Sequence, residues 1–358
     1  MELASFHHLL GAAVRNSASD VHFKVGSPPA LRMHGNLRPI KAPALAPDDL
    51  TRIAGYILTA SRFKGSLDEL TEADASYALD GVGRFRTSIF RQKGNLAVVM
   101  RAIPLAVPTF EQLGLPPVLQ KIAAEDRGLV LVTGVTGSGK SSTLAAFVDF
   151  INTHDRKHIL TIEDPIEFLH EDKSSRVTQR EVGPDTPNFG AALRAALRQD
   201  PDVILLGEMR DLETIEIAMR AAETGHLVLS TVHTTDAART VNRLISAFPS
   251  DSQGSVRQRL TECLRAIVSQ RLLPHASGTG RVAAVEILIN TMSVREFIKE
   301  PGRIDSIKDY LEKSHEMYGT QSFDQHLAAL IKAGSITLET AKSAASNPAD
   351  LERALSFE

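Results

Sequence analysis

The run LVLVTGVTGSGKSS, residues 129–142, carries the strongest pattern in this sequence. Apolar and β-branched residues lead into a glycine-rich turn, and the alanine-rich TLAAFVDFI, residues 143–151, continues from it as a helix-like stretch. Within the run, GVTGSGKS matches G-x-x-x-x-G-K-[ST] with no mismatch, in the strand–loop–helix context that the motif requires. Backbone N–H groups of such a loop point at phosphate oxygens, and the N-terminus of the following helix attracts negative charge. The sequence therefore predicts a site for a nucleoside triphosphate.

The same motif assigns chemistry to individual side chains. Lys140 can reach the β- and γ-phosphates, and the Ser141 hydroxyl can bind Mg²⁺. A nucleoside triphosphate and Mg²⁺ are therefore the expected ligands. The residues expected to contact the nucleotide are Gly134, Val135, Thr136, Gly137, Ser138, Gly139, Lys140, Ser141 and Ser142. The alternative, a glycine-rich turn with a chance lysine, is disfavoured by the flanking strand and helix.

From about residue 118, helix-like segments alternate with strands that are apolar almost throughout. These strands are GLVLVTG, HILTIED, DVILLGE, HLVLSTVH and, later, RVAAVEILI. Continuously apolar strands are typical of a parallel sheet that is covered on both faces. The sequence predicts an α/β ATPase core over residues 118–290 and a helical region over residues 291–358.

The first part of the chain has a different pattern. A short helix precedes the strand-like runs DVHFKV and ALRMHGNLRPI, helices follow near residues 47–70, and residues 75–103 alternate as three strands with turns at 81–83 and 93–95. We expect a small α+β domain over residues 1–103. Residues 104–117 contain four prolines, which is typical of a linker or hinge.

Composition narrows the class of protein. At 358 residues the chain is long for one core, so two domains are expected. A net charge of −3 argues against general nucleic-acid binding, and no apolar run approaches the roughly 20 residues that cross a bilayer. The N-terminus lacks the features of a signal peptide, and the lone Cys263 is expected to be a small buried hydrophobe. We therefore expect a cytoplasmic protein without a transmembrane segment.

Acidic residues follow two of the apolar strands. In DVILLGEMRD, Glu208 comes just after a strand, where a carboxylate can hold Mg²⁺ directly or through water. In HILTIEDPIEF, Glu163 ends a strand and can orient or deprotonate the attacking water, while Asp164 and Glu167 can instead cap the turn. The carboxyl ends of parallel strands face the ligand crevice, which favours these roles over that of plain surface carboxylates.

Two histidines bracket the next strand, HLVLSTVHTTD. We expect His233, and with less support His226, to hydrogen-bond the terminal phosphate and to signal its loss. The alternative for each is a structural histidine. A metal site is disfavoured, since no third histidine or cysteine lies nearby at ligand spacing.

Arginines recur along GRFRTSIFR. We expect Arg84, Arg86 and Arg91 to share one face of a strand, with Arg101 on the next strand. Guanidinium groups gathered in this way suit an anion, so these residues are candidate arginine fingers that supply charge to the γ-phosphate from another domain or subunit. The alternative is a solvated basic face with local ion pairs.

Together these motifs resemble the secretion-ATPase superfamily, and specifically the PilT-like type IV pilus retraction ATPases. Four signature elements of the family are present: the phosphate loop GVTGSGKS, the aspartate box ILTIEDPIEF, the acidic motif LLGEMRD and the histidine box HLVLSTVHT. Further stretches that agree are SDVHFKVGSPPALRMHG, RFRTSIFRQ, VTQREVG, LRQDPDVI and ASGTGRVAAVE. The resemblance covers roughly residues 1–335.

The resemblance implies a PAS-like N-terminal domain, a RecA-like ATPase domain with a helical C-terminal extension, and a homohexameric ring with nucleotide between the domains. It implies Glu163 as catalytic base, Glu208 as the Mg²⁺-associated carboxylate and His233 as phosphate sensor. Arg84, Arg86 and Arg101 would be the phosphate-facing residues of the other domain. The implied function is a motor that retracts type IV pili at the cytoplasmic face of the inner membrane, working on an integral-membrane platform protein.

Other functions stay open at this stage. Extension ATPases of the superfamily are longer and carry a four-cysteine zinc insertion, which this chain lacks. SVREFIKE, residues 293–300, stands where retraction ATPases carry an AIRNLIRE-like segment, and this leaves room for a PilU-like accessory paralogue or a type II secretion motor. A scaffold that binds ATP without turnover is disfavoured by the presence of both Glu163 and Glu208. A DNA translocase is disfavoured by the acidic composition and the absence of tryptophan.

Overall fold

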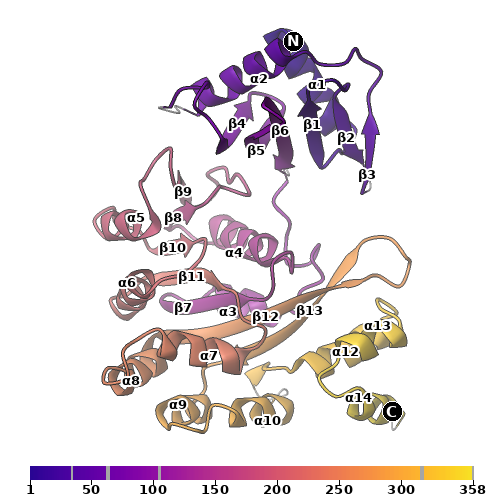
Figure 1. The fold of residues 1–358 in the computed structure, drawn as a ribbon. Helices are drawn as coiled ribbons and strands as arrows, with labels where there is room; N and C mark the ends of the chain where they lie inside the picture. The colour runs from indigo at the N-terminus through magenta and orange to yellow at the C-terminus, as the bar shows by residue number, and fades with distance from the viewer. Residues whose placement is uncertain (34, 62–64, 104–105, 315–317, 357–358) are drawn as a thin grey trace. The chain divides into compact units, whose positions relative to one another are not determined.

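The computed structural model describes residues 1–33, 35–61, 65–103, 106–314 and 318–356, and it divides into two compact units (Figure 1). The first unit comprises Met1–Ala106 and Glu167–Leu169, and the second comprises Val107–Ile166 and His170–Glu358. Pro104 and Leu105, which open the expected linker, lie outside the described residues.

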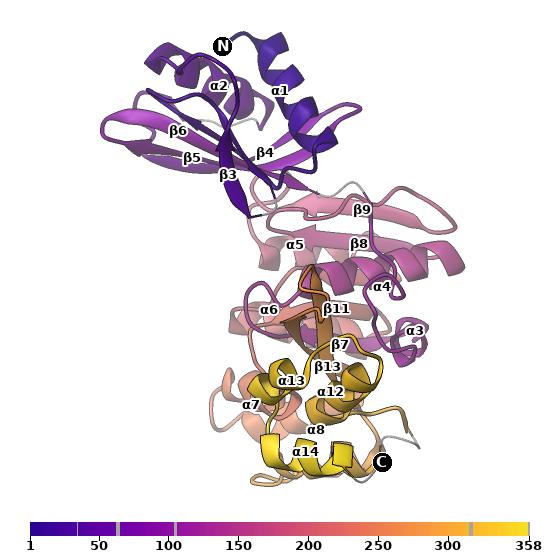
Figure 2. The same ribbon diagram turned by 90° about the vertical axis from the view of Figure 1, so that its right-hand side faces the viewer.

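The first unit is an antiparallel sheet with two helices on one of its faces (Figure 2). Its elements are α1 (Leu3–Arg15), β1 (Asp20–Lys24), β2 (Ala30–Met33), β3 (Asn36–Pro39), α2 (Pro47–Ala60), β4 (Glu72–Leu79), β5 (Gly83–Gln92) and β6 (Asn95–Ile103). Within the described residues the strand order is β3-β2-β1-β6-β5-β4. The first helix, β1, the helix α2 and the three strands after it confirm elements expected from the sequence. The run ALRMHGNLRPI, expected as one strand, forms two antiparallel strands, β2 and β3, and the expected helical stretch near residues 47–70 ends at Ala60.

Strand alternation separates the two faces of this sheet. In β5, Phe85, Thr87 and Ile89 are fully buried and face α1 and α2, since a strand turns successive side chains to opposite sides. Arg84 and Arg86 therefore lie on the other face. The first unit thus has one apolar face that carries its core and one polar face that carries arginines.

The second unit is built on a sheet that is parallel except at one edge. Its strands are β7 (Gly128–Thr133), β8 (His158–Glu163), β9 (Arg176–Glu181), β10 (Val203–Leu206), β11 (Leu227–Val232), β12 (Leu264–Pro274) and β13 (Arg281–Ile289). Its helices up to β12 are α3 (Val118–Ala123), α4 (Lys140–His154), α5 (Phe189–Ala196), α6 (Leu212–Glu223), α7 (Ala237–Ser246) and α8 (Gln253–Cys263). Within the described residues the strand order is β13-β12-β7-β11-β10-β8-β9.

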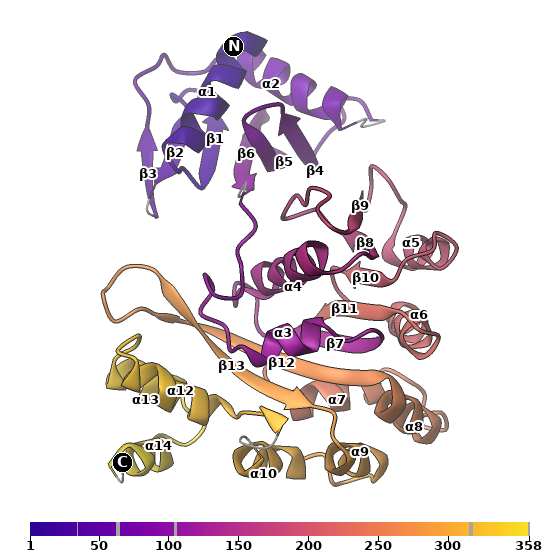
Figure 3. The same cartoon turned by 180° about the vertical axis from the view of Figure 1, so that it is seen from behind.

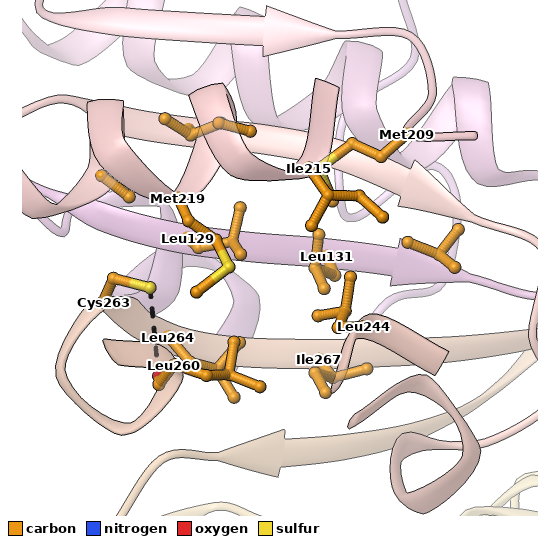
Figure 4. Close-up of a cluster of buried hydrophobic side chains, with 14 of the residues drawn as sticks. Leu129, Leu131, Met209, Ile215, Met219, Leu244, Leu260, Cys263, Leu264 and Ile267 are labelled. Atoms are coloured by element: carbon orange, nitrogen blue, oxygen red, sulfur yellow. Dashed lines mark hydrogen bonds between the residues drawn. The ribbon is translucent and has the colours of Figure 1, made fainter. Parts of the chain in front are cut away.

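Both faces of this sheet are covered, which explains why its central strands are apolar throughout. Along β7, Leu129 and Leu131 pack against α5–α8, while Val130 and Val132 pack against α3 and α4. Figure 4 shows the first of these cores, where the Cys263 thiol points at the Leu260 carbonyl oxygen. Burial raises the pKa of this thiol to about 12, so Cys263 is the small buried hydrophobe that the sequence predicted.

Two features of the sheet differ from the sequence-based expectation. RVAAVEILI forms β13, which pairs antiparallel with β12 and not within the parallel set. The strands β12 and β9 were not expected at all. β12 carries the buried polar residues Ser269 and Gln270, and β9 is an edge strand with a mostly polar sequence, so neither has the apolar pattern that marked the others.

The chain after β13 is helical, as predicted. The helices described there are α9 (Met292–Lys299), α10 (Ser306–Lys313), α12 (Phe323–Lys332), α13 (Leu338–Ala344) and α14 (Pro348–Ser356). α12 lies beside β13 (Figure 3). Its Phe323 and Leu327 belong to the same apolar cluster as Ala284 of β13. Across the described parts of the chain, no helix combines the length and the apolar character that crossing a bilayer requires.

A buried carboxylate joins β13 to α7. Glu286 is 7% exposed, and its Oε1 accepts the N–H of Ala237, the first residue of α7, at 2.7 Å. Burial raises the pKa of this carboxyl to about 7, with Asp236 adding to the shift while Ser269 and Arg271 oppose it. The folded protein therefore binds a proton at Glu286 at pH values where the unfolded chain has lost it.

This proton predicts a pH-dependent difference in stability. Because the pKa of Glu286 rises from an ordinary 4.5 to about 7, its protonation favours the folded state below pH 4.5, and this advantage is lost as pH rises to 7. Relative to Glu286→Gln, the wild type should lose about 3 kcal/mol of unfolding free energy across that window. Urea unfolding of both proteins at pH 5 and pH 8 measures this, with the exposed Glu262→Gln as control. Parallel pH dependences for wild type and Glu286→Gln would contradict it.

Candidate functional site

The phosphate loop, residues 134–141, connects β7 to α4 in the conformation that its glycines allow. Gly137 and Gly139 have φ angles of +79° and +91°, values that residues with a Cβ rarely adopt. Gly139 is the N-cap of α4, and the Ser138 N–H donates to the Val135 carbonyl at 3.2 Å. The expected strand, loop and helix are therefore present.

The side chains of the loop fit a phosphate group. Lys140 is 8% exposed, and its Nζ donates to the carbonyl oxygens of Gly134 and Val135 at 3.0 and 3.1 Å. The Ser138 hydroxyl is buried and has no hydrogen-bond partner among the described residues, a condition that costs about 1–3 kcal/mol. Oxygens of a bound phosphate would satisfy both donors. Thr136 lies exposed at the tip of the loop, within reach of a ligand.

β12 supports this loop from behind. The Thr143 hydroxyl on α4 donates to Gln270 Oε1 at 2.8 Å, and the Thr133 hydroxyl at the end of β7 donates to Ser269 Oγ at 3.1 Å. These four side chains are all buried. The polar residues of β12 therefore fix the two ends of the phosphate loop.

Gly134 leaves no room for a side chain. A Cβ at this position would lie 2.4 Å from the Gln270 carbonyl oxygen and 2.4 Å from Ser138 Oγ, at a φ of +146°. We expect Gly134→Ala to displace the loop and to weaken ATP binding about tenfold or more, which is about 1.4 kcal/mol. Equilibrium titration with a fluorescent ATP analogue measures this. Gly254→Ala is the control, since nothing lies within 4 Å of a Cβ at that position. Equal ATP affinities for the wild type, Gly134→Ala and Gly254→Ala would contradict the packing argument.

Glu163, Glu208 and His233 lie at the edge of the sheet that is formed by the carboxyl ends of its parallel strands. The phosphate loop begins at the same edge. Thr133 of β7 pairs with Val232 of β11, so His233 comes directly beside the start of the loop. β10 lies next to β11 and β8 next to β10, which brings Glu208 and Glu163 to successive positions along this edge. The structure therefore brings together three residues that the sequence placed far apart.

Two basic side chains lie next to the Glu208 carboxylate. Arg210 Nη2 lies 2.7 Å from its Oε1, and His233 Nε2 lies 3.3 Å from its Oε2. The Glu208 side chain is 14% exposed, whereas His233 and Arg210 are much more accessible. This arrangement links the histidine after β11 to the carboxylate after β10.

Gly207, just before Glu208, lies against the end of β8. A Cβ on Gly207 would meet the Ile162 carbonyl oxygen at 3.4 Å and Glu163 Cα at 3.5 Å, which is ordinary van der Waals contact. The Gly207 carbonyl accepts the Thr231 hydroxyl at 2.7 Å. Glu163 itself accepts hydrogen bonds from Thr161 and Gln179 through Oε1.

His226 lies elsewhere. It precedes β11, and its Nδ1 is 2.9 Å from the Ala221 carbonyl oxygen at the end of α6. The six residues of β11 separate it from His233, so seven residue steps, about 23 Å along a strand, lie between the two histidines. The structure therefore does not bring His226 to the edge that carries the phosphate loop, and its geometry is that of a turn-stabilising histidine.

The arginines of the first unit form a row across its polar face. Arg86 and Arg101 are cross-strand partners, and Arg101 Nε donates to Oδ1 of the buried Asp20 at 2.9 Å. Arg84 lies two residues before Arg86 on the same face of β5. Their roles toward a nucleotide remain predictions.

Arg91 does not share this face. The register of β5 is continuous to Gln92, so an odd-numbered residue points to the opposite side from Arg84 and Arg86. Its guanidinium donates to the backbone carbonyls of Leu67, Asp68, Leu70 and Gly94. The expectation that Arg91 belongs to the anion-facing row was wrong, because Arg91 stands five positions after Arg86 and an odd spacing changes the face.

Several residues near the site were not predicted. Gln179 and Gln270 contact Glu163 and Thr143 through pairings that exist only in the folded sheet. Arg210 contacts Glu208 from two residues further along the chain. Thr161 could have been found, because it stands two residues before Glu163 on one strand and must share its face.

Comparison with known proteins gives this site a family. The model of the family described as "Type II/IV secretion system protein" matches residues 3–353. The chain is 44% identical over 340 residues to the Pseudomonas aeruginosa protein named "Type IV pilus retractation ATPase PilT", covering 95% of this chain and 98% of that relative. It is 39% identical over 346 residues to "Type IV pilus ATPase PilU" of the same organism, covering 97% and 90%.

A solved structure agrees over the same span. The crystal structure of the pilus retraction motor PilT with bound ADP matches with a TM-score of 0.88 and 44% identity, covering 97% of this chain and 98% of that one. The likeness extends over both units, well beyond the phosphate loop. The chain belongs to the type II/IV secretion system protein family, and within that family it is PilT-like.

Proposed function

We propose that this chain is an ATP-hydrolysing motor that powers type IV pilus retraction, the disassembly of pilin. One observation carries the proposal. The chain combines a complete phosphate loop with Glu163 and Glu208 at the neighbouring strand ends, and it is 44% identical over 95% of its length to a protein named for pilus retraction. We further propose that it works as a homohexamer at the cytoplasmic face of the inner membrane, with a membrane platform protein as direct partner.

The proposed chemistry begins at the loop. Lys140 exchanges its bonds to the Gly134 and Val135 carbonyls for oxygens of the β- and γ-phosphates, and backbone N–H groups of the loop hold the remaining oxygens. Mg²⁺, bound through Ser141 and through Glu208 directly or by water, would neutralise phosphate charge. The Ser141 and Glu208 oxygens are hard ligands of the kind that Mg²⁺ prefers.

Glu163 is the proposed general base. Its carboxylate orients the attacking water and accepts a proton from it. β11 and β10 lie between β7 and β8, so the axes of β7 and β8 are about 14 Å apart. A base on β8 can therefore act only on the phosphate that projects furthest from the loop. That phosphate is the γ-phosphate, which hydrolysis removes.

His233 is the proposed sensor of that phosphate. Its contact with Glu208 couples the terminal phosphate to the Mg²⁺-associated carboxylate, so loss of the phosphate changes the partners of both side chains. Arg84, Arg86 and Arg101 are the proposed arginine fingers, acting from the first unit of the same or a neighbouring subunit. His226 is left outside the proposed phosphate contacts because of its position at the other end of β11.

We propose a PAS-like domain over residues 1–103 and a RecA-like ATPase core over residues 118–290, with a C-terminal helical region over residues 291–358. Residues 104–117 would be the hinge between the first two. The antiparallel sheet of the first unit and the parallel sheet of the second support this division. Hydrolysis would open and close the two domains about that hinge.

A PilU-like accessory motor is the second candidate. The 39% identity to PilU and the altered segment SVREFIKE, which forms most of α9, favour keeping it. A retraction assay in a host from which the corresponding motor has been deleted separates the two. Retraction restored by this chain alone supports the first proposal, with Lys140→Ala as the inactive control. Restoration only together with a paralogous ATPase supports the accessory role, and no restoration in either case contradicts both.

A further inference from the structure

Glu163 sits among donors that two neighbouring strands supply in register. Thr161 and Gln179 are direct partners across the parallel pair β8–β9, and Glu163 follows Thr161 by two residues on the same face. The Thr161 hydroxyl donates to Glu163 Oε1 at 2.7 Å, and Gln179 Nε2 donates to the same oxygen at 3.2 Å. Two neutral donors thus meet one oxygen of the proposed base.

The orientation of the Gln179 amide is fixed from its other end. Gln179 Oε1 accepts the backbone N–H of His170 at 2.8 Å. A backbone N–H can only donate, so the amide oxygen must face His170 and the amide nitrogen must face Glu163. The loop after β8 therefore determines that Gln179 presents a donor, and not an acceptor, to the carboxylate.

We propose that Gln179 is a positioning residue for Glu163, and that Thr161 shares this role. Both donors bind Oε1, so rotation of the carboxylate about its last bond would break both hydrogen bonds at once. The other oxygen is thereby restricted to a small range of directions, which is what a base needs to meet a water in line with the phosphorus. The proposal rests on the role of Glu163 given above.

A neighbouring carboxylate makes these donors more important. Glu181 is the cross-strand partner of Glu163, lies on the same face as Gln179 and is 3% exposed. Its Oε2 accepts the Ile166 N–H at 3.1 Å. Like charges directly opposite each other repel, so each carboxylate requires its own donors, and Thr161 and Gln179 supply those of Glu163.

The test is a mutant cycle on the full-length protein. Gln179→Met keeps the length of the side chain and removes the donor, and Thr161→Val keeps the branched shape and removes the hydroxyl. Each should lower kcat for ATP hydrolysis about tenfold, while KM for ATP and the binding of a non-hydrolysable ATP analogue stay within twofold. Gln258→Met is the matched control, since Gln258 donates to Glu262 in the same way on the exposed face of α8.

The cycle separates positioning from a purely structural role. In a Glu163→Gln background, Gln179→Met should change kcat by less than about twofold, because its effect passes through the carboxylate. A further tenfold loss of kcat in that background overturns the proposal. A normal kcat for Gln179→Met, with Glu163→Gln inactive, also overturns it. In both cases the assignment of the chain as an ATPase stands. If Glu163→Gln keeps full activity, the role of Glu163 falls and the positioning role falls with it. Thermal unfolding of every variant shows whether a loss comes from misfolding.

Discussion

Replacing Lys140 with alanine is expected to abolish nucleotide-dependent activity while leaving the fold in place. The lysine is buried at the start of α4, and its Nζ donates to two carbonyls of the phosphate loop, which places its charge inside the loop that the phosphates would enter. Removing one preorganised charge from a phosphoryl-transfer site costs about a hundredfold to a thousandfold in rate. Steady-state hydrolysis should fall by that factor or more, and the affinity for ATP should fall with it.

The control for Lys140→Ala is Lys121→Ala, an exposed lysine on α3. That variant should hydrolyse ATP like the wild type. Thermal unfolding distinguishes loss of the ligand contact from loosening of the loop, because Lys140 also joins two of the loop carbonyls. Wild-type turnover by a folded Lys140→Ala protein would mean that the phosphate loop is not the hydrolytic site.

Glu163→Gln has the second large expected effect, and its signature differs. The substitution keeps the shape of the side chain and an oxygen that can accept the Thr161 hydroxyl, but it removes the ability to take a proton. General-base catalysis contributes about a hundredfold to ten-thousandfold, so kcat should fall by at least a hundredfold. ATP affinity should stay within a few-fold of wild type, because the base contacts water and not the bound phosphates.

Single-turnover measurements with radiolabelled ATP test this prediction, since they separate binding from the chemical step. Glu171→Gln, on the exposed stretch between β8 and β9, is the matched control and should be fully active. A Glu163→Gln protein with normal kcat would mean that another residue is the base. A loss of ATP affinity with unchanged kcat would instead assign Glu163 to binding.

The centre of the second unit could be predicted from the sequence because its signals are local. Leu129 to Thr133 are apolar or β-branched since both faces of β7 are covered, and the glycines of the loop show the turn directly. The residues after β8, β10 and β11 could be placed at one edge because parallel strands end on the same side. These features need no knowledge of which strand pairs with which.

What the sequence did not reveal depends on pairing. β12 contains Ser269 and Gln270, which are buried only because Thr133 and Thr143 lie opposite them, more than a hundred residues earlier. Gln179 faces Glu163 only through the register of β8 and β9. The direction of β13 follows from its hairpin with β12, and an apolar strand reads the same in either direction.

The histidines and arginines show a second limit. His226 and His233 look equivalent in HLVLSTVHTTD, yet they lie at opposite ends of the six-residue strand β11. Arg91 seemed to continue the series of Arg84 and Arg86, although parity alone places it on the other face. In both cases the residue type suggested function, and the strand geometry determined which residue could serve it.

The central claim is that this chain is a hexameric ATP-driven motor, and the most direct test is steady-state ATP hydrolysis measured across size-separated oligomers. Wild type, Glu163→Gln and Glu208→Gln would be assayed side by side in each fraction. We expect turnover to be confined to a hexamer-sized species and to be lost in both variants. Equal turnover by the monomer, or turnover unaffected by Glu163→Gln, would contradict it.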